Sequence, residues 1–223
     1  NGGAGLDAPG GVITSNVIKA YYAIQAALIS DDMLIAGNTI DGTTLIVAPK
    51  TGVVVDINNN TLGNNTQMTP ASYYAALELR SVETADVNVS GNQFVNYVNI
   101  GLLSEASKNV MVIGNTFTPD ATANAFVSIM ANTKLMTNGA QGNTYSDEIV
   151  IKANTFNAGV TGEGTAILFA DHYGVNTPAF GAITIGGATA ATYTATNVAS
   201  TSYYRAVVTS GGCSSATSNS AAV

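Results

Sequence analysis

The feature that most constrains this chain is an eight-residue phrase that returns along its length. Residues 110–117 read "VMVIGNTF", and residues 149–156 read "IVIKANTF". Written as apolar, any, apolar, any, small, Asn, Thr or Gln, apolar, the phrase occurs at five places. The copies are Met33 to Ile40, Val55 to Leu62, Val87 to Phe94, Val110 to Phe117, and Ile149 to Phe156.

Within each copy the first and third residues are apolar, while the second and fourth vary between polar and apolar. A period of two predicts a β-strand with one face committed to a core. The residue before each asparagine is one that permits a tight bend or, in most copies, a positive φ. These bend residues are Gly37, Asn59, Gly91, Gly114 and Ala153.

The spacing of the asparagines that recur in this phrase favours a solenoid over a globular α/β domain. Successive asparagines lie 22, 32, 23 and 39 residues apart, as in coils that tolerate insertions on one side. If coils stack about 4.8 Å apart, each amide is expected to bond to the amides above and below. The predicted ladder consists of Asn38, Asn60, Asn92, Asn115 and Asn154.

A second strand precedes most copies, as in residues 75–79, 100–104, 126–130 and 166–170, with polar turns between them. The stretch "GLLSEASKNVMVIGNTF", residues 101–117, resembles the coil of the pectin-lyase-like superfold. That resemblance covers about residues 20–175 and implies a right-handed parallel β-helix, assigned here to residues 1–178. Residues 15–29 remain open to two alternatives, an amphipathic capping helix with Ser15 as its N-cap or another coil.

After residue 178 the phrase disappears and Ala, Thr and Ser dominate. The sequences "ATYTATN" and "YYRAVVTSGGCSS" resemble the second half of immunoglobulin-like repeats in long surface proteins of Bacteroidetes-type bacteria. Tyr203, Tyr204, Arg205 and Cys213 carry the match. Residues 179–223 are therefore predicted to be a partial immunoglobulin-like segment, since about 45 residues cannot close a seven-strand sandwich.

Composition excludes several classes of partner. The net charge is −7, only 9% of residues are charged, and Lys and Arg form no cluster, which argues against nucleic acid. No apolar run reaches the roughly 18–20 residues of a membrane span. The single cysteine, Cys213, excludes a disulfide within the chain and argues against a zinc site.

Catalytic signatures are weak. Asp41, in "NTIDG", lies in a stretch like the "NTDG" of polygalacturonases, and Asp31 with Asp32 is like their second motif, but Ile40 interrupts the match. Arg80 is the candidate base of a lyase, and His172 is the one histidine, each also compatible with a structural role. Asp147 and Glu148 are a weak calcium candidate; no metal site or other cofactor is predicted.

One outward column is a candidate binding surface. Thr or Gln follows each asparagine, so these residues are expected to form a stripe along the solenoid: Thr39, Thr61, Gln93, Thr116 and Thr155. Such a stripe suits contact with polysaccharide, although Thr also favours exposed strand positions for its own sake.

Together these patterns predict a non-enzymatic module of a large secreted or cell-surface protein. It is expected to act as an adhesin or stalk that contacts extracellular polysaccharide or other surface proteins. The alternative is a β-helix polysaccharide lyase or glycoside hydrolase.

Overall fold

A computed structural model shows an all-β chain. It describes residues 10–64, 75–80, 82, 84–123, 126–132, 148–157, 164–170 and 183–186, and four pairs at 203–204, 207–208, 216–217 and 221–222. Among the described residues, no helix has the length and apolar character that a membrane crossing needs.

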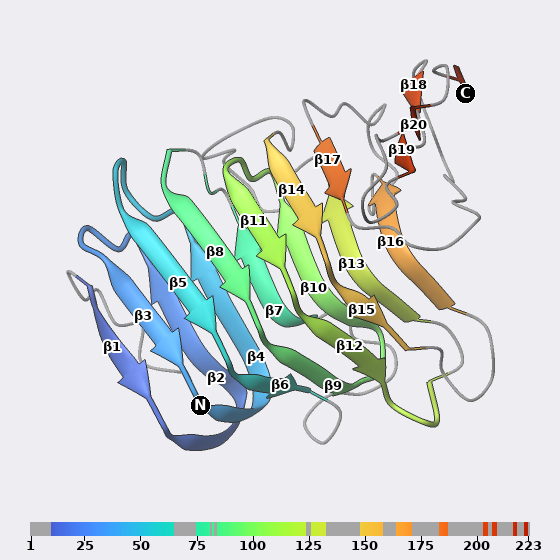
Figure 1. Cartoon of the computed structure of the whole chain (residues 1–223). Helices are drawn as coiled ribbons and strands as arrows, with labels where there is room; N and C mark the ends of the chain where they lie inside the picture. Colours follow the sequence, from blue (N-terminus) through green and yellow to red (C-terminus); the bar gives the residue numbers. More distant parts are fainter. Residues whose placement is uncertain are drawn as a thin grey trace.

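The first side of the solenoid is a seven-stranded sheet in which neighbouring strands pair in parallel. Its strands follow one another in chain order, each separated from the next by the rest of a coil. Figure 1 shows this sheet in front. The strands are β1 (Gly11–Thr14), β3 (Met33–Ala36), β5 (Val54–Asn58), β8 (Asp86–Ser90), β11 (Val110–Ile113), β14 (Ile149–Lys152) and β17 (Ile183–Gly186).

A ten-stranded parallel sheet supplies the other two sides. Two of its strands are long, β2 (Val17–Ala27) and β4 (Thr39–Val47). The start of β4 pairs with β6 (Thr61–Gly63) and its end pairs with β7 (Ala75–Arg80), so the sheet divides at β4. Gly42 lies at this division, where a Cβ would overlap the carbonyl oxygen of Ala20.

The two branches of the ten-stranded sheet run side by side along the solenoid. In Figure 1 the β6 branch lies along the lower side and the β7 branch lies behind the first sheet. Beyond β6 come β9 (Gln93–Tyr97), β12 (Thr116–Pro119) and β15 (Thr155–Phe156). Beyond β7 come β10 (Ile100–Glu105), β13 (Phe126–Asn132) and β16 (Gly164–Ala170). These strands confirm an all-β parallel solenoid.

The open choice at residues 15–29 is resolved in favour of a coil. Residues 17–27 form β2, which pairs in parallel with β4 through two register shifts. The preceding β1 pairs with β3, so the first described coil has the same order of strands as the later ones. An amphipathic capping helix is therefore wrong for this segment.

The bends have the conformation that the phrase predicts. Each of the five bend residues has a positive φ: Gly37 at 64°, Asn59 at 54°, Gly91 at 64°, Gly114 at 67° and Ala153 at 54°. A positive φ at this residue bends the chain from the first sheet into the β6 branch. It is costly for a residue with a Cβ, which explains why glycine occupies three of these positions.

The core consists of apolar side chains stacked in columns. The clearest column is aromatic: the Phe94 and Phe117 rings lie 4.4 Å apart with an 8° interplanar angle, and Phe156 follows at 5.3 Å. Tyr97 is also fully buried, and its hydroxyl lies 2.7 Å from the Ser128 hydroxyl. Burial raises the pKa of Tyr97 to about 12.

Beyond residue 178 the structure describes β17 and four short strands. β18 (Tyr203–Tyr204) pairs antiparallel with β21 (Ala221–Ala222), and β19 (Val207–Val208) pairs antiparallel with β20 (Ala216–Thr217). β17, in contrast, joins the first sheet of the solenoid. The sheet therefore extends past residue 178, the boundary expected from composition.

Candidate functional site

The asparagines after the bends lie one above another. Asn38 donates its backbone N–H and its side-chain NH2 to Oδ1 of Asn60, at 2.9 and 3.0 Å. Asn60 donates in the same way to Asn92, at 2.9 and 3.0 Å. Asn92 donates to Asn115, and Asn115 donates to Asn154, with N···O distances of 2.8 to 3.0 Å. The result is a one-directional amide ladder, in which each coil donates to the coil that follows it in sequence.

The ladder amides also donate to backbone carbonyls of the preceding coil, and Asn38, Asn60 and Asn92 donate to a carbonyl of their own bend. The NH2 group of Asn115 contacts the carbonyl of Val89 at 2.9 Å, and that of Asn92 contacts Ile57 at 2.8 Å and Ser90 at 3.1 Å. Donors and acceptor are therefore satisfied inside the protein, as a buried amide requires. From Asn38 to Asn115 the rungs are at most 1% exposed, so the ladder is scaffold and not an accessible surface.

A further rung, Asn16, was missed in the sequence pattern. Its backbone N–H and its NH2 lie 2.9 and 3.1 Å from Oδ1 of Asn38. Residues 11–18, "GVITSNVI", are a degenerate copy of the repeated phrase. Gly11 replaces the first apolar residue and Val17 replaces Thr or Gln, while Ser15 before the asparagine has the expected positive φ of 58°.

The predicted outward column lies in register along the β6 branch. Thr39 pairs with Thr61, Thr61 with Gln93, and the series continues to Thr116 and Thr155. Thr39, Gln93 and Thr155 are exposed, and Thr61 and Thr116 are partly exposed. Neighbouring strands in a sheet are about 4.8 Å apart, so the column is a regular row of hydroxyl and amide groups. We call these five residues the polar column.

Asp41 lies two residues beyond the start of the polar column. Its Oδ2 atom is 3.2 Å from Nζ of Lys19 on the adjacent β2. Asp32, just before β3, accepts the Val54 N–H at 2.8 Å and so supports the start of β5. Asp31 and Asp32 precede the first sheet, whereas Asp41 is on the β4 strand that follows the bend. Asp31 accepts the Asp32 N–H at 3.3 Å, so each of the three aspartates has a local structural partner.

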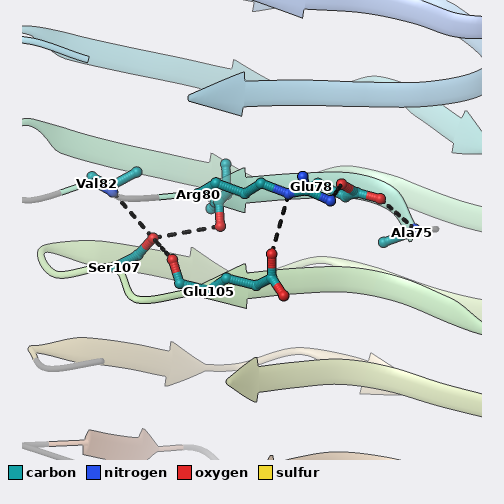
Figure 2. Close-up of polar contacts among 7 residues, drawn as sticks. Ala75, Glu78, Arg80, Val82, Glu105 and Ser107 are labelled. Atoms are coloured by element: carbon teal, nitrogen blue, oxygen red, sulfur yellow. Dashed lines mark hydrogen bonds and ion pairs between the residues drawn. The ribbon is translucent and has the colours of Figure 1, made fainter. Parts of the chain in front are cut away.

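Arg80 belongs to a buried cluster that the sequence pattern did not indicate. Its Nη2 atom lies 2.7 Å from Oε2 of Glu78, and its Nε atom lies 3.1 Å from Oε2 of Glu105 (Figure 2). Glu78 and Arg80 come from β7, and Glu105 comes from the adjacent β10. The side chains of Glu78 and Glu105 are 0% and 1% exposed, and that of Arg80 is 22% exposed. We call these three residues the carboxylate–arginine cluster.

Backbone and side-chain contacts fix this cluster. The Ala75 N–H donates to Oε1 of Glu78 at 3.1 Å. Ser107 donates to the Glu105 carbonyl at 2.8 Å and accepts the Val82 N–H at 3.2 Å, which ties the turn after β10 to the segment after β7 (Figure 2). The surroundings are apolar, because Leu103 lies opposite Glu78 in the register. It belongs to an apolar cluster with Ala75, Ile100 and Met130.

Burial raises the pKa of Glu78 above its ordinary value of 4.5. The positive charge of Arg80 and the Ala75 hydrogen bond lower it, whereas the nearby Glu105 raises it further. Two carboxylates facing one guanidinium leave an excess negative charge in an apolar place, which favours the protonated form of Glu78. The cluster has the group types of an acid–base site, but both carboxylates are closed to solvent.

The other sequence candidates are placed as follows. Glu148, just before β14, is exposed. His172, Asp147 and Cys213 lie outside the described residues. Within the described part of the chain, no group of three or more His, Cys, Asp or Glu side chains is arranged to hold a metal ion.

Comparison with known proteins identifies one segment. A family model described as a domain of unknown function (DUF8696) matches residues 176–223. No curated protein and no solved structure matches the chain. The family match covers well under half of the sequence and includes β17, so it describes only the C-terminal part of the chain.

Proposed function

We propose that this chain is a non-enzymatic module of a large secreted or cell-surface protein, an adhesin or stalk whose side contacts polysaccharide. The single observation that carries the proposal is the register of the polar column. Its members lie on adjacent parallel strands and reach the surface in one row, whereas the strongest candidates for acid–base chemistry are buried in ion pairs.

The chemistry of the polar column suits a glycan. A threonine hydroxyl both donates and accepts a hydrogen bond, and the Gln93 amide does the same with separate atoms. A row of such groups matches the hydroxyl-rich edge of a polysaccharide without requiring charge. Since Thr also favours exposed strand positions, the column would be present in a bare scaffold too. Removal of its hydroxyl groups distinguishes the two cases.

The remaining sequence expectations support the same assignment. Parallel crossover connections are nearly always right-handed, which favours a right-handed β-helix of the pectin-lyase-like type. A long solenoid of stacked coils suits a stalk, since each coil contacts only its neighbours and the array lengthens without a new core. The resemblance of residues 179–223 to immunoglobulin-like repeats of bacterial surface proteins supports a secreted or cell-surface location.

The carboxylate–arginine cluster favours a second candidate function, a polysaccharide lyase or glycoside hydrolase. A buried glutamate with a raised pKa beside a second carboxylate and an arginine is a combination used for acid–base chemistry. In this structure Glu78 and Glu105 are at most 1% exposed, so a sugar cannot contact their carboxylates in this conformation. This candidate therefore ranks second.

A glycan-binding measurement tests the proposal. The chain is applied to an array of neutral and acidic polysaccharides beside a variant with Thr39→Val, Thr61→Val and Thr116→Val. A matched control carries Thr14→Val, which removes an exposed hydroxyl from β1, on the first sheet. We expect binding to at least one polysaccharide, a tenfold or greater loss in the column variant, and no loss in the control. Equal binding by all three proteins, or no binding of the wild-type chain to any polysaccharide, overturns the proposal of a polysaccharide contact.

A further inference from the structure

The family-matched segment, residues 176–223, enters the solenoid with its first described strand. β17 pairs in parallel with β14 over four positions, with Ile183 opposite Ile149 and Ile185 opposite Ile151. This is the same relationship that β14 has with β11, where Val110 lies opposite Ile149 and Val112 opposite Ile151. The segment of unknown function is therefore continuous with the first sheet at this point, and β17 occupies the end of that sheet.

The sequence that begins at β17 is a degenerate copy of the repeated phrase. Residues 183–190 read "ITIGGATA", against "IVIKANTF" at residues 149–156. The two apolar residues, the small residue and the threonine keep their places, and Ala188 takes the place of the asparagine. The alignment of these two sequences agrees with the strand register in the structure, where Ile183 lies opposite Ile149.

The amide ladder can be followed as far as Asn154. Asn38, Asn60, Asn92 and Asn115 each donate a backbone N–H and an NH2 group to Oδ1 of the next asparagine. Asn154 donates its NH2 group back to the Val112 carbonyl, at 2.8 Å. Asn154 is also partly exposed, whereas the four preceding rungs are buried. The ladder thus ends at Asn154 among the described residues.

We propose that the segment of residues 176–223 terminates the solenoid. β17 is the last described strand of the first sheet, and alanine takes the place of the asparagine that would extend the amide ladder. A stack of coils needs such a terminus, because an uncovered final coil exposes apolar core and a row of unpaired backbone groups. Ile149 and Ile151 in β14 are each only 2% exposed, consistent with a covered final part of the core. This assigns a role to the family-matched segment, and it does not depend on polysaccharide binding.

The first test breaks the β17 pairing in the full-length chain. Thr184→Pro removes a backbone N–H and clashes with regular strand pairing. The control, Val208→Pro, makes the same change in β19, which pairs with β20 instead of the solenoid. Hydrogen exchange of the β14 amides is measured in both. We expect at least tenfold faster exchange of the β14 amides that face β17 in Thr184→Pro, and wild-type exchange in Val208→Pro. Equal β14 exchange in the two variants overturns the proposal.

The second test extends the ladder and remains decisive if the proline variant does not fold. Ala188→Asn restores the asparagine of the phrase, and Thr189→Asn places the same side chain one residue later as the control. If the segment continues the coil, Oδ1 of the new asparagine accepts the Asn154 N–H and NH2. We expect a rise of a few degrees in the unfolding midpoint and at least tenfold slower exchange of the Asn154 amide with Ala188→Asn only. The same values for the two variants would contradict a terminal coil built on the repeated phrase.

Discussion

Asn92 donates both its backbone N–H and its side-chain NH2 group to a single acceptor, Oδ1 of Asn115, at 2.9 and 3.0 Å. The acceptor belongs to the next coil, 23 residues later in sequence. This contact explains why the same polar residue recurs in an otherwise variable phrase. Two bends can stack closely only if the N–H groups that turn inward find acceptors, and an amide supplies both an acceptor and the donors for the following coil.

Asn115→Leu is expected to destabilise the solenoid strongly. The substitution leaves the Asn92 N–H without its acceptor and the Val89 carbonyl without its donor, both in the interior. Each buried polar group left unsatisfied costs about 1–3 kcal/mol, so a loss of roughly 3 kcal/mol is expected in the free energy of unfolding. Chemical denaturation measures it. Asn88→Leu, an asparagine on the outer face of β8, is the control and should lose about 1 kcal/mol or less.

Phe117→Ala is expected to create a cavity in the middle of the aromatic column. Phe117 is fully buried and lies between the Phe94 and Phe156 rings. Truncation of a buried phenylalanine typically costs about 3–5 kcal/mol. Met111→Ala, at a position 40% exposed on the adjacent β11, is the control and should have a small effect. A loss below about 1 kcal/mol for Phe117→Ala in urea denaturation would contradict the stacked core.

Glu78→Gln is expected to flatten the pH dependence of stability. The pKa of Glu78 is raised in the folded chain, so between its ordinary value of 4.5 and the folded value the folded state holds a proton that the unfolded state has released. Stability therefore falls as pH rises through that window and is constant with respect to this group outside it. The difference between wild type and Glu78→Gln in free energy of unfolding should shift in favour of the variant as pH rises. Phe117→Ala removes no titratable group, so its difference from wild type in free energy of unfolding should not change with pH. A difference that is likewise constant for Glu78→Gln would contradict the raised pKa.

Much of the fold could be predicted from the sequence because the repeated phrase specifies both a strand and its bend. Gly91 and Gly114 signal the positive φ directly, and Asn59 is a residue that tolerates it. The phrase failed at the first and the last described strands of the first sheet. At the first coil Gly11 and Val17 obscure it, and at β17 the diagnostic asparagine is replaced by Ala188. Terminal repeats are atypical because they face something other than another coil.

The carboxylate–arginine cluster could not be predicted from the sequence. Glu78 and Glu105 are separated by a whole coil, and nothing in either strand indicates that Arg80 contacts both. The residues meet only because β7 and β10 pair in a fixed register, with Arg80 opposite Glu105. The polar column was predictable for the opposite reason, since its members occupy one place in the repeated phrase and the register needs only to be regular.

The most direct test of the account measures binding and turnover together. Wild-type chain, the polar-column variant and Arg80→Ala are incubated with each polysaccharide of the panel, and bound protein, reducing ends and unsaturated products are recorded from the same samples. The account predicts binding that is lost in the polar-column variant and kept in folded Arg80→Ala, with no product from any protein. Product formation by the wild-type chain that Arg80→Ala abolishes, while its folding and binding persist, would contradict it and establish the carboxylate–arginine cluster as the functional site.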